Sequence, residues 1–310
     1  MNLAKTVLVT GIGGFLGGYV SAWFSGKGWR VIGIDVLPRT AIVGFPGDVY
    51  QQLNIGNGLL PDLMQVEQPA VCVHCAGSAS VPRSMSEPMS DFRANVSMTG
   101  MLLEAIRTHA PSCAAVLLSS AAVYGSPLEL PINEEAELGP ISSYGFHKRM
   151  AEELFAEYAT CHGLRTACVR IFSAYGSGLR RQVLWDLCNK LVNANTVVLQ
   201  GTGLESRDFV HARDVANAIA AVVERADFRG ECYNVASGAE TSIAELAQKL
   251  GAAMQLQRFI EFDGVLPQGV PSRWRADISR IQDLGFTPEV SIDCGVAEYA
   301  KWVLPELLRA

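Results

Sequence analysis

Short apolar runs recur along the chain, and most of them are followed by glycine, serine or another small residue. The run at 6–10 reads TVLVT and the run at 30–35 reads RVIGID. Runs of this length that are rich in β-branched residues predict buried parallel strands. Between them lie a glycine-rich stretch at 11–18 and a helical segment that ends near Gly28. The N-terminus is therefore predicted to fold as strand, glycine turn, helix and strand.

The same alternation continues beyond this unit. The segment 144–158 is rich in helix formers and has apolar residues at helical spacing, which predicts a helix. Strands that alternate with helices are typical of an α/β fold. The fold class we predict is a Rossmann-type doubly wound parallel sheet with a smaller C-terminal lobe. Further buried strands are expected near 71–76, 115–118, 166–172, 197–200 and 234–235.

The glycine turn predicts a dinucleotide-binding unit. Gly11 permits a tight turn, Gly14 lets backbone amides approach a pyrophosphate, and Gly17 lets the helix pack close to the sheet. The N-terminus of the following helix would then face the anion. Asp35 ends the second strand, about twenty residues after the glycines, where a carboxylate accepts hydrogen bonds from an adenosine ribose.

A tyrosine and a lysine lie four residues apart in the middle of the chain, at Tyr144 and Lys148. On a helix they share one face. A free phenol has a pKa of about 10 and is no base at neutral pH, but a neighbouring ammonium and a cationic nicotinamide would both favour the phenolate. We therefore expect a lowered pKa for Tyr144. The alternative interpretation, for the pair taken alone, is a surface tyrosine beside a solvated lysine.

With Tyr144-x-x-x-Lys148, the spacing Gly-x-x-Gly-x-x-Gly resembles the extended short-chain dehydrogenase/reductase family of NAD-dependent nucleotide-sugar epimerases and dehydratases. The resemblance extends from Thr10 to about Trp302. It implies three catalytic residues, Ser120, Tyr144 and Lys148, and NAD as the cofactor. The cofactor-binding residues that it implies are Gly11, Gly14, Phe15, Leu16, Gly17, Asp35, Asn54, Ile55, Ala76, Gly77, Asn95, Tyr144 and Lys148.

The resemblance also implies a nucleotide-diphosphate sugar as the substrate, with Arg207 on the diphosphate. The chain departs from the family at three positions. Asn54 stands where an aspartate is usual, Ser173 where an asparagine is usual, and no arginine precedes Gly269. Arg180 and its neighbour Arg181 add charge, although an exposed basic pair is the alternative. The substrate-binding residues implied are Ser78, Ser80, Ser120, Ser173, Arg180, Arg207 and Arg273.

The two residues after Ser120 limit the reactions that a member of this family could catalyse. Similar dehydratases and decarboxylases carry acids at these positions and related epimerase/reductases carry a cysteine, whereas Ala121 and Ala122 have no ionisable atom. What remains is hydride and proton exchange at one carbinol carbon. The first hypothesis is a nucleotide-sugar epimerase, acting at C4 through a 4-keto intermediate. The second is an NAD(P)H-dependent reductase of a nucleotide-linked 4-keto-6-deoxy sugar, and the third is a non-catalytic cofactor-sensing protein.

Composition sets the remaining expectations. The chain has 310 residues, 49% of them hydrophobic, and a formal charge of −6 without a basic patch, so no nucleic-acid partner is expected. No metal-ligand spacing, membrane-span run or secretory signal is apparent, and the scattered cysteines suit a reducing cytoplasm.

The predicted NAD-binding domain covers 1–170 with roughly 205–238, and the substrate lobe covers 171–204 and 239–310. The resemblance also implies a homodimer, formed by helices near 91–109 and 144–162.

Overall fold

The computed structural model describes residues 5–42, 44–265 and 271–309. Its centre is a seven-stranded parallel sheet in the order β10-β6-β5-β4-β1-β2-β3, with two small sheets beside it. The predicted fold class is confirmed. The strands of the central sheet are β1 (Thr6–Thr10), β2 (Arg30–Asp35), β3 (Val49–Gln52), β4 (Val71–His74), β5 (Ala114–Ser120), β6 (Thr166–Ile171) and β10 (Arg229–Val235).

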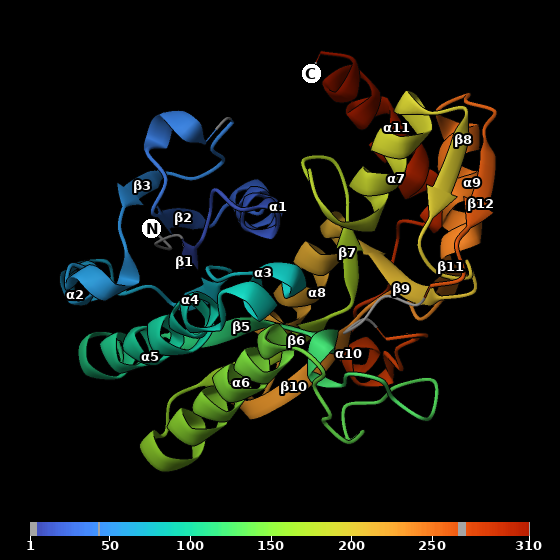
Figure 1. The fold of residues 1–310 in the computed structure, drawn as a ribbon. Coiled ribbons are helices and arrows are strands. Elements are labelled where there is room, and N and C mark those ends of the chain that lie inside the picture. The colour runs from blue at the N-terminus through green and yellow to red at the C-terminus, as the bar shows by residue number, and fades with distance from the viewer. Residues whose placement is uncertain (1–4, 43, 266–270, 310) are drawn as a thin grey trace.

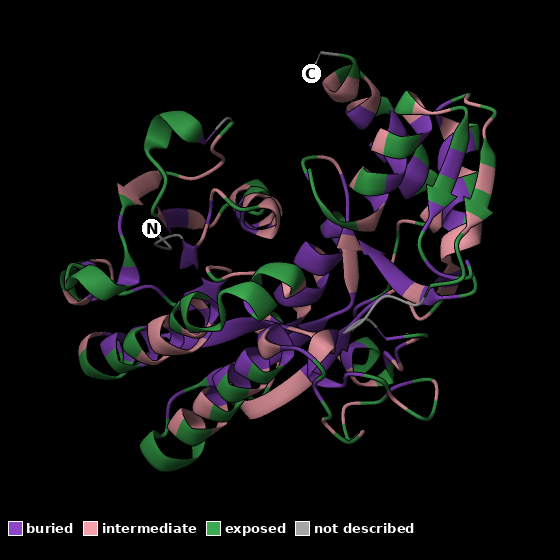
Figure 2. Cartoon of the chain, viewed as in Figure 1, coloured by how far each residue is buried: buried purple, intermediate pink, exposed green. Residues whose placement is uncertain are grey.

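Helices cover both faces of this sheet, as Figure 1 shows. On one face pack α1 (Phe15–Gly26) and α8 (Ala212–Arg225), whereas α2 (Leu60–Glu67), α5 (Met98–His109) and α6 (Ser143–His162) pack on the other. Along β1, Val7 and Val9 face the first layer and Leu8 faces the second. Because both faces are covered, the inner strands β1, β4 and β5 are largely apolar, and Figure 2 shows the middle of the sheet as buried.

Shorter elements connect the sheet to its helices. The helix before α5 is interrupted by a π-helical turn, and such turns occur frequently at functional sites. The connecting elements are η1 (Arg39–Ala41), η2 (Ile55–Asn57), α3 (Val81–Ser86), α4 (Pro88–Phe92), the π-helix η3 (Arg93–Ser97) and η4 (Ala121–Val123).

A separate apolar core lies in the C-terminal half, in the upper right of Figure 1. It includes Leu187 of α7, Leu250 of α9 and Tyr299 of α11. Ile278 and Phe286, in contrast, pack into the core of the central sheet. The domain boundaries stay a prediction. The remaining elements are β7 (Ser173–Tyr175), α7 (Gln182–Asn193), β8 (Thr196–Leu199), β9 (Ser206–His211), β11 (Glu240–Ser242), α9 (Ile243–Ala253), β12 (Phe259–Phe262), α10 (Ser279–Asp283) and α11 (Ile292–Arg309).

None of the helices in the described ranges is long and apolar enough to cross a membrane.

Candidate active site

The glycine turn after β1 has the close packing that its sequence predicted. Gly11 has φ +67°, a conformation that glycine adopts without strain. A Cβ atom on Gly17 would lie 2.2 Å from the carbonyl oxygen of Gly11, so any side chain there would push α1 off the turn. Gly14 is the N-cap of α1. The turn therefore presents backbone amides at a helix N-terminus, an arrangement that suits a phosphate group.

Asp35 closes this turn from the end of β2. Its Oδ2 accepts a hydrogen bond from the amide of Gly13 at 2.9 Å, and its Oδ1 accepts one from the amide of Leu37 at 3.1 Å. A Cβ atom on Gly13 would lie 3.1 Å from Oδ2. Sequence reasoning overlooked Gly13, although its place beside Gly14 was a signal. Arg39 lies on η1 and is held by Ile42 O and the ring of Phe45.

A cavity of about 660 Å³ runs from Asp35 across the glycine turn to the loop after β4. Predicted cofactor and substrate residues from separate parts of the chain meet in its wall. Phe15, Leu16 and Gly17 are not in this wall, and neither are Ser120, Tyr144 and Lys148. The predicted residues in the wall are Gly11, Gly14, Asp35, Asn54, Ile55, Ala76, Gly77, Ser78 and Ser80, and Arg83, Asp91, Arg93 and Arg181 join them.

A buried chain of hydrogen bonds positions the loop after β4. His74 Nδ1 lies 2.7 Å from Thr10 Oγ1, and its Nε2 lies 3.1 Å from Thr99 Oγ1. Thr10 Oγ1 accepts from the amide of Ala76, and Thr99 donates to the carbonyl oxygen of Asn95. Burial lowers the pKa of His74 to about 3, so the ring is neutral. Each hydroxyl has one hydrogen, so Thr10 donates to Nδ1 and Nε2–H donates to Thr99. This chain ties the glycine turn to the π-helical turn.

Tyr144 and Lys148 lie on the first turns of α6, where the helix is capped by Ser142. Lys148 Nζ donates to the carbonyl oxygen of Leu118 on β5 at 2.9 Å. Burial raises the pKa of Tyr144, and the charge of Asp91 raises it further, against a hydrogen bond with Ser120 and the charge of Arg181, which both lower it. The protein groups alone therefore raise this pKa, and the expected lowering, which also counts a cationic nicotinamide, stays a prediction. Desolvation disfavours the phenolate, and the protein supplies too little positive charge to reverse this.

Burial also lowers the pKa of Lys148, to about 8. The Asp91 carboxylate opposes this effect more than any other group. A cofactor that carries positive charge beside the phenol would supply what the protein lacks. The site thus brings together a phenol, Tyr144, a nearby hydroxyl, Ser120, and an ammonium, Lys148.

A buried ion pair lies one helical turn after Lys148. Arg170 Nη2 on β6 and Glu152 Oε2 on α6 are 2.9 Å apart, and both side chains are at least nine-tenths buried. Ser119, next to Ser120, donates to Glu152, and Arg170 Nη1 donates to the hydroxyl of Tyr124 at 2.9 Å. The pair therefore joins the strand and turn that carry Ser120 to the helix that carries Tyr144.

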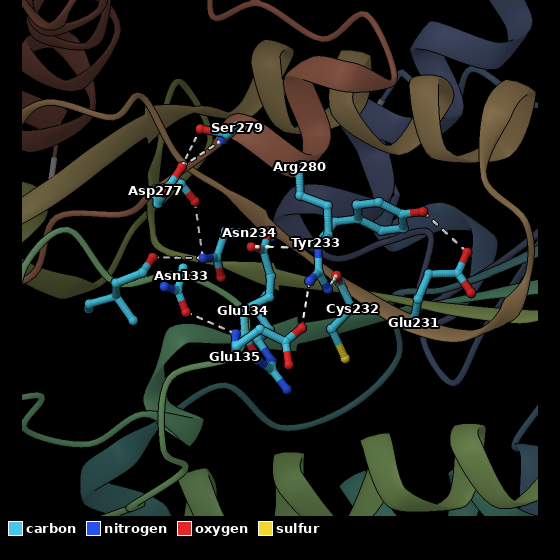
Figure 3. Close-up of polar contacts among 12 residues, drawn as sticks. Asn133, Glu134, Glu135, Glu231, Cys232, Tyr233, Asn234, Asp277, Ser279 and Arg280 are labelled. Carbon is cyan, nitrogen blue, oxygen red and sulfur yellow. Dashed lines mark hydrogen bonds and ion pairs between the residues drawn. The ribbon is translucent and has the colours of Figure 1, made fainter.

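The loop between η4 and α6 is fixed by a second polar network, drawn in Figure 3. The amide of Asn234 on β10 donates to Glu134 Oε1 at 2.8 Å, and its side-chain nitrogen donates to the carbonyl oxygens of Ile132 and Asp277. Arg280 on α10 pairs with Glu135. The two ends of this loop carry Ser120 and Tyr144, so anchoring it to the sheet stabilises their relative position.

Arg207 on β9 is a partly buried cation without a carboxylate within ion-pair distance in the described part of the chain. Its guanidinium donates to the carbonyl oxygen of Ser206 and lies over the ring of Trp274. Burial lowers its pKa to about 10. An anionic group of a ligand would offset the free-energy cost of burying this charge, which fits the predicted contact with a diphosphate.

The other predicted arginines differ in where they lie. Arg180 pairs with Glu306 on α11, and Arg273 pairs with Glu240. Arg181 lines the cavity and Arg180 does not. The alternative interpretation, an exposed basic pair outside the site, therefore applies only to Arg180.

Two further departures from the family pattern are Ser173 and the missing arginine before Gly269. Ser173 opens β7 and is half-buried. The position before Gly269, where an arginine is missing, falls in the segment 266–270 and lies outside the described residues. Substrate contacts by Ser173 and by the arginines stay a prediction.

Three comparisons relate this geometry to known proteins. The sequence model of a family described as the NAD dependent epimerase/dehydratase family matches residues 7–236. A UDP-glucose 4-epimerase of Azospirillum brasilense is 30% identical over 91% of this chain and 87% of its own, and a GDP-6-deoxy-D-mannose reductase of Pseudomonas aeruginosa is 27% identical over 94% of each. The solved structure of MoeE5 in complex with UDP-glucose and NAD has a TM-score of 0.88 and 26% identity, covering 98% of this chain and all of that one.

Proposed function

The chain belongs to the NAD-dependent epimerase/dehydratase family, and on that premise we propose that it is a nucleotide-sugar epimerase that acts at C4 of the sugar. The observation that carries the proposal is the turn after Ser120. Ala121 and Ala122 stand there, so the turn offers no acid or base besides the Ser120–Tyr144 pair. Elimination of water or carbon dioxide needs such a group, whereas exchange at one carbinol carbon does not.

The residues fit NAD on grounds of shape and charge. Gly11, Gly13 and Gly17 leave a cradle that side chains would fill, and both side-chain polar atoms of Asn95 are buried without a partner in the described structure. The cavity is long enough to take in both Asp35 and Ser80. These residues, with Ala76 and Gly77, would hold the dinucleotide. Bound NAD supplies the acceptor that takes the C4 hydride and returns it.

The side chains of the protein handle the proton. Tyr144 takes the proton of the C4 hydroxyl as general base and returns it when the alcohol reforms. The Ser120 hydroxyl, close to Tyr144, donates to the oxygen at C4. Lys148, held on the carbonyl oxygen of Leu118, favours the phenolate when it is protonated. Arg207 holds the diphosphate while the keto sugar rotates to present its other face.

The second candidate is a reductase of a nucleotide-linked 4-keto-6-deoxy sugar. The similarity to the Pseudomonas aeruginosa reductase and the serine at position 173 favour it, but the similarity to the UDP-glucose 4-epimerase of Azospirillum brasilense favours epimerisation. An epimerase regenerates its cofactor in every cycle, whereas a reductase consumes it. The two are distinguished by absorbance of reduced nicotinamide and by NMR of the products, with nucleotide-hexoses and nucleotide-4-keto-6-deoxy sugars as substrates. Stoichiometric cofactor loss with a keto-sugar, and no C4 exchange with any hexose nucleotide, would reject the epimerase.

NAD is expected to bind at least about tenfold more tightly than NADP. The Asp35 carboxylate is fixed by two backbone amides at the adenosine end of the cavity, where it would repel a 2′-phosphate. Arg39 is held by Ile42 and Phe45, so it does not offset that repulsion. Calorimetric titration with each dinucleotide measures the ratio. Tighter binding of NADP would mean that a cation governs this end of the site.

We further propose a cytoplasmic homodimer that is formed through α5 and α6. Apolar side chains stand out from these helices into solvent, with Met101 49%, Phe146 48% and Met150 40% exposed. Leu102 and Ile106 of the same segment are buried on the sheet, so the interface would use only the outer side of α5. Figure 2 shows those outer faces as exposed. Sedimentation equilibrium gives the mass of the assembly.

A further inference from the structure

An acidic side chain that the sequence did not single out lies in the wall of the cavity that Asp35 also lines. Asp91 on α4 is 2% exposed, and its Oδ2 lies 2.7 Å from Nδ1 of His147 on α6. A carboxylate only accepts, so His147 donates. The imidazole packs edge-on against the ring of Phe92. This contact between neighbouring helices fixes the orientation of the carboxylate.

The second oxygen of Asp91 has no hydrogen-bond partner among the described residues. Asp91 Oδ1 is buried and makes no hydrogen bond within the described structure, although the residue lines the cavity. A buried carboxylate oxygen without a partner costs free energy, which a ligand donor would recover. Asn95 lies one turn further on, and both polar atoms of its side-chain amide are likewise buried without a hydrogen-bond partner in the described structure.

Lys148 offers the complementary group at the same place. It has three donors, and within the described ranges it uses one, on the carbonyl oxygen of Leu118. A Cβ atom on Gly77, in the cavity wall, would lie 3.7 Å from Lys148 Nζ and 2.6 Å from Asn95 Oδ1, so both side chains approach that glycine. Asp91 and Lys148 are more than 4.0 Å apart, since no ion pair joins them. A group that fits between an ammonium and a carboxylate must both accept and donate, and a hydroxyl does both.

We propose that Asp91, oriented by His147, is a cofactor-binding residue that accepts a hydrogen bond from a hydroxyl of the ribose at the nicotinamide end of NAD while Lys148 donates to that ribose. The inference rests on the proposed NAD-dependent function and adds a contact to it. Asp35 marks the adenosine end of the cavity, so the ribose near Gly77 is the other one. Asp91 also supplies negative charge that keeps Lys148 protonated.

The affinity for NAD tests the contact without turnover. Asp91→Asn keeps the shape but turns an acceptor into a donor beside Lys148, so NAD should bind about 10- to 100-fold more weakly, as for loss of a charged hydrogen bond. Glu153→Gln is the matched control, because it removes one negative charge from the exposed side of α6 and should leave affinity unchanged. A loss of less than about tenfold in Asp91→Asn would overturn the proposal. If the wild-type chain bound no NAD, the proposed function itself would fail.

The pH dependence of NAD binding gives a second readout. The groups that face Lys148 are Asp91 from α4, His74 from β4, Cys75 from the loop after β4, Tyr144 and Glu152 from α6, and Cys168 from β6. The pKa of Lys148 is about 8, so wild-type affinity should weaken as pH rises through that value and the ammonium is lost. Removal of the Asp91 charge lowers this pKa further, so in Asp91→Asn the loss should begin at lower pH. An unshifted midpoint would contradict an electrostatic link to Lys148.

An NAD analogue without the ribose hydroxyls at the nicotinamide end distinguishes a direct hydrogen bond to Asp91 from a purely structural role of that residue. Asp91→Asn should bind this analogue with nearly wild-type affinity, because the hydroxyl that Asp91 contacts is gone. An equal penalty for NAD and the analogue would mean that Asp91 only stabilises the fold. Should Asp91→Asn not fold, His147→Leu keeps the carboxylate but frees it to rotate, and it should show the same preferential loss for NAD over the analogue. Equal affinity of His147→Leu and wild type for NAD would overturn the orienting role.

Discussion

Tyr144→Phe should lower turnover by about 10²–10⁴, the range typical of losing general acid–base catalysis. The substitution keeps the buried ring and the hydrogen bond from the Tyr144 amide to Ser84 of α3, and it removes only the group that titrates. Steady-state turnover with a nucleotide-sugar measures the effect, with NAD content and thermal stability as checks of folding. Retention of more than about a tenth of the wild-type rate would show that another group carries the proton.

Lys148→Ala extends this test to the electrostatic environment of the phenol. Burial raises the pKa of Tyr144, so the phenolate depends on nearby positive charge. Removal of the ammonium should cause a loss of similar size. Lys148→Met keeps most of the side-chain volume, and it distinguishes loss of charge from loss of packing.

Glu152→Ala should lower the free energy of unfolding by about 3–5 kcal/mol, because it leaves Arg170 buried and unpaired between β6 and α6. Arg170 donates to both oxygens of Glu152, and Ser119 donates to the same carboxylate. All these donors lose their partner together. Chemical denaturation monitored by tryptophan fluorescence measures the change.

Two variants separate burial of an unpaired charge from other causes. Glu153→Ala removes the adjacent acid, whose ion pair with Arg149 is exposed, and should cost less than about 1 kcal/mol. The double variant Glu152→Ala with Arg170→Met removes both charges and should recover part of the stability. A double variant less stable than Glu152→Ala would mean that Arg170 stabilises the fold mainly through Tyr124 and the loop at 134.

The sequence alone determined the features that depend on neighbours within a few residues. The apolar runs predicted the strands β1 and β2 with their observed bounds, because the interior of a strand buried on both faces is largely apolar. The glycines predicted the turn, because a positive φ at Gly11 and a close approach at Gly17 both exclude side chains. The four-residue spacing of Tyr144 and Lys148 placed both on one face of α6.

Only the tertiary structure decided which distant residues meet. Asp91 and His147 are 56 positions apart, and Thr10, His74 and Thr99 come from β1, β4 and α5. No local pattern marks such pairs, since their contact depends on how helices pack on the sheet. The sign of the pKa change at Tyr144 belongs with them, because desolvation is a property of everything packed around a group. The different surroundings of Arg180 and Arg181 likewise follow from where α11 and the cavity lie.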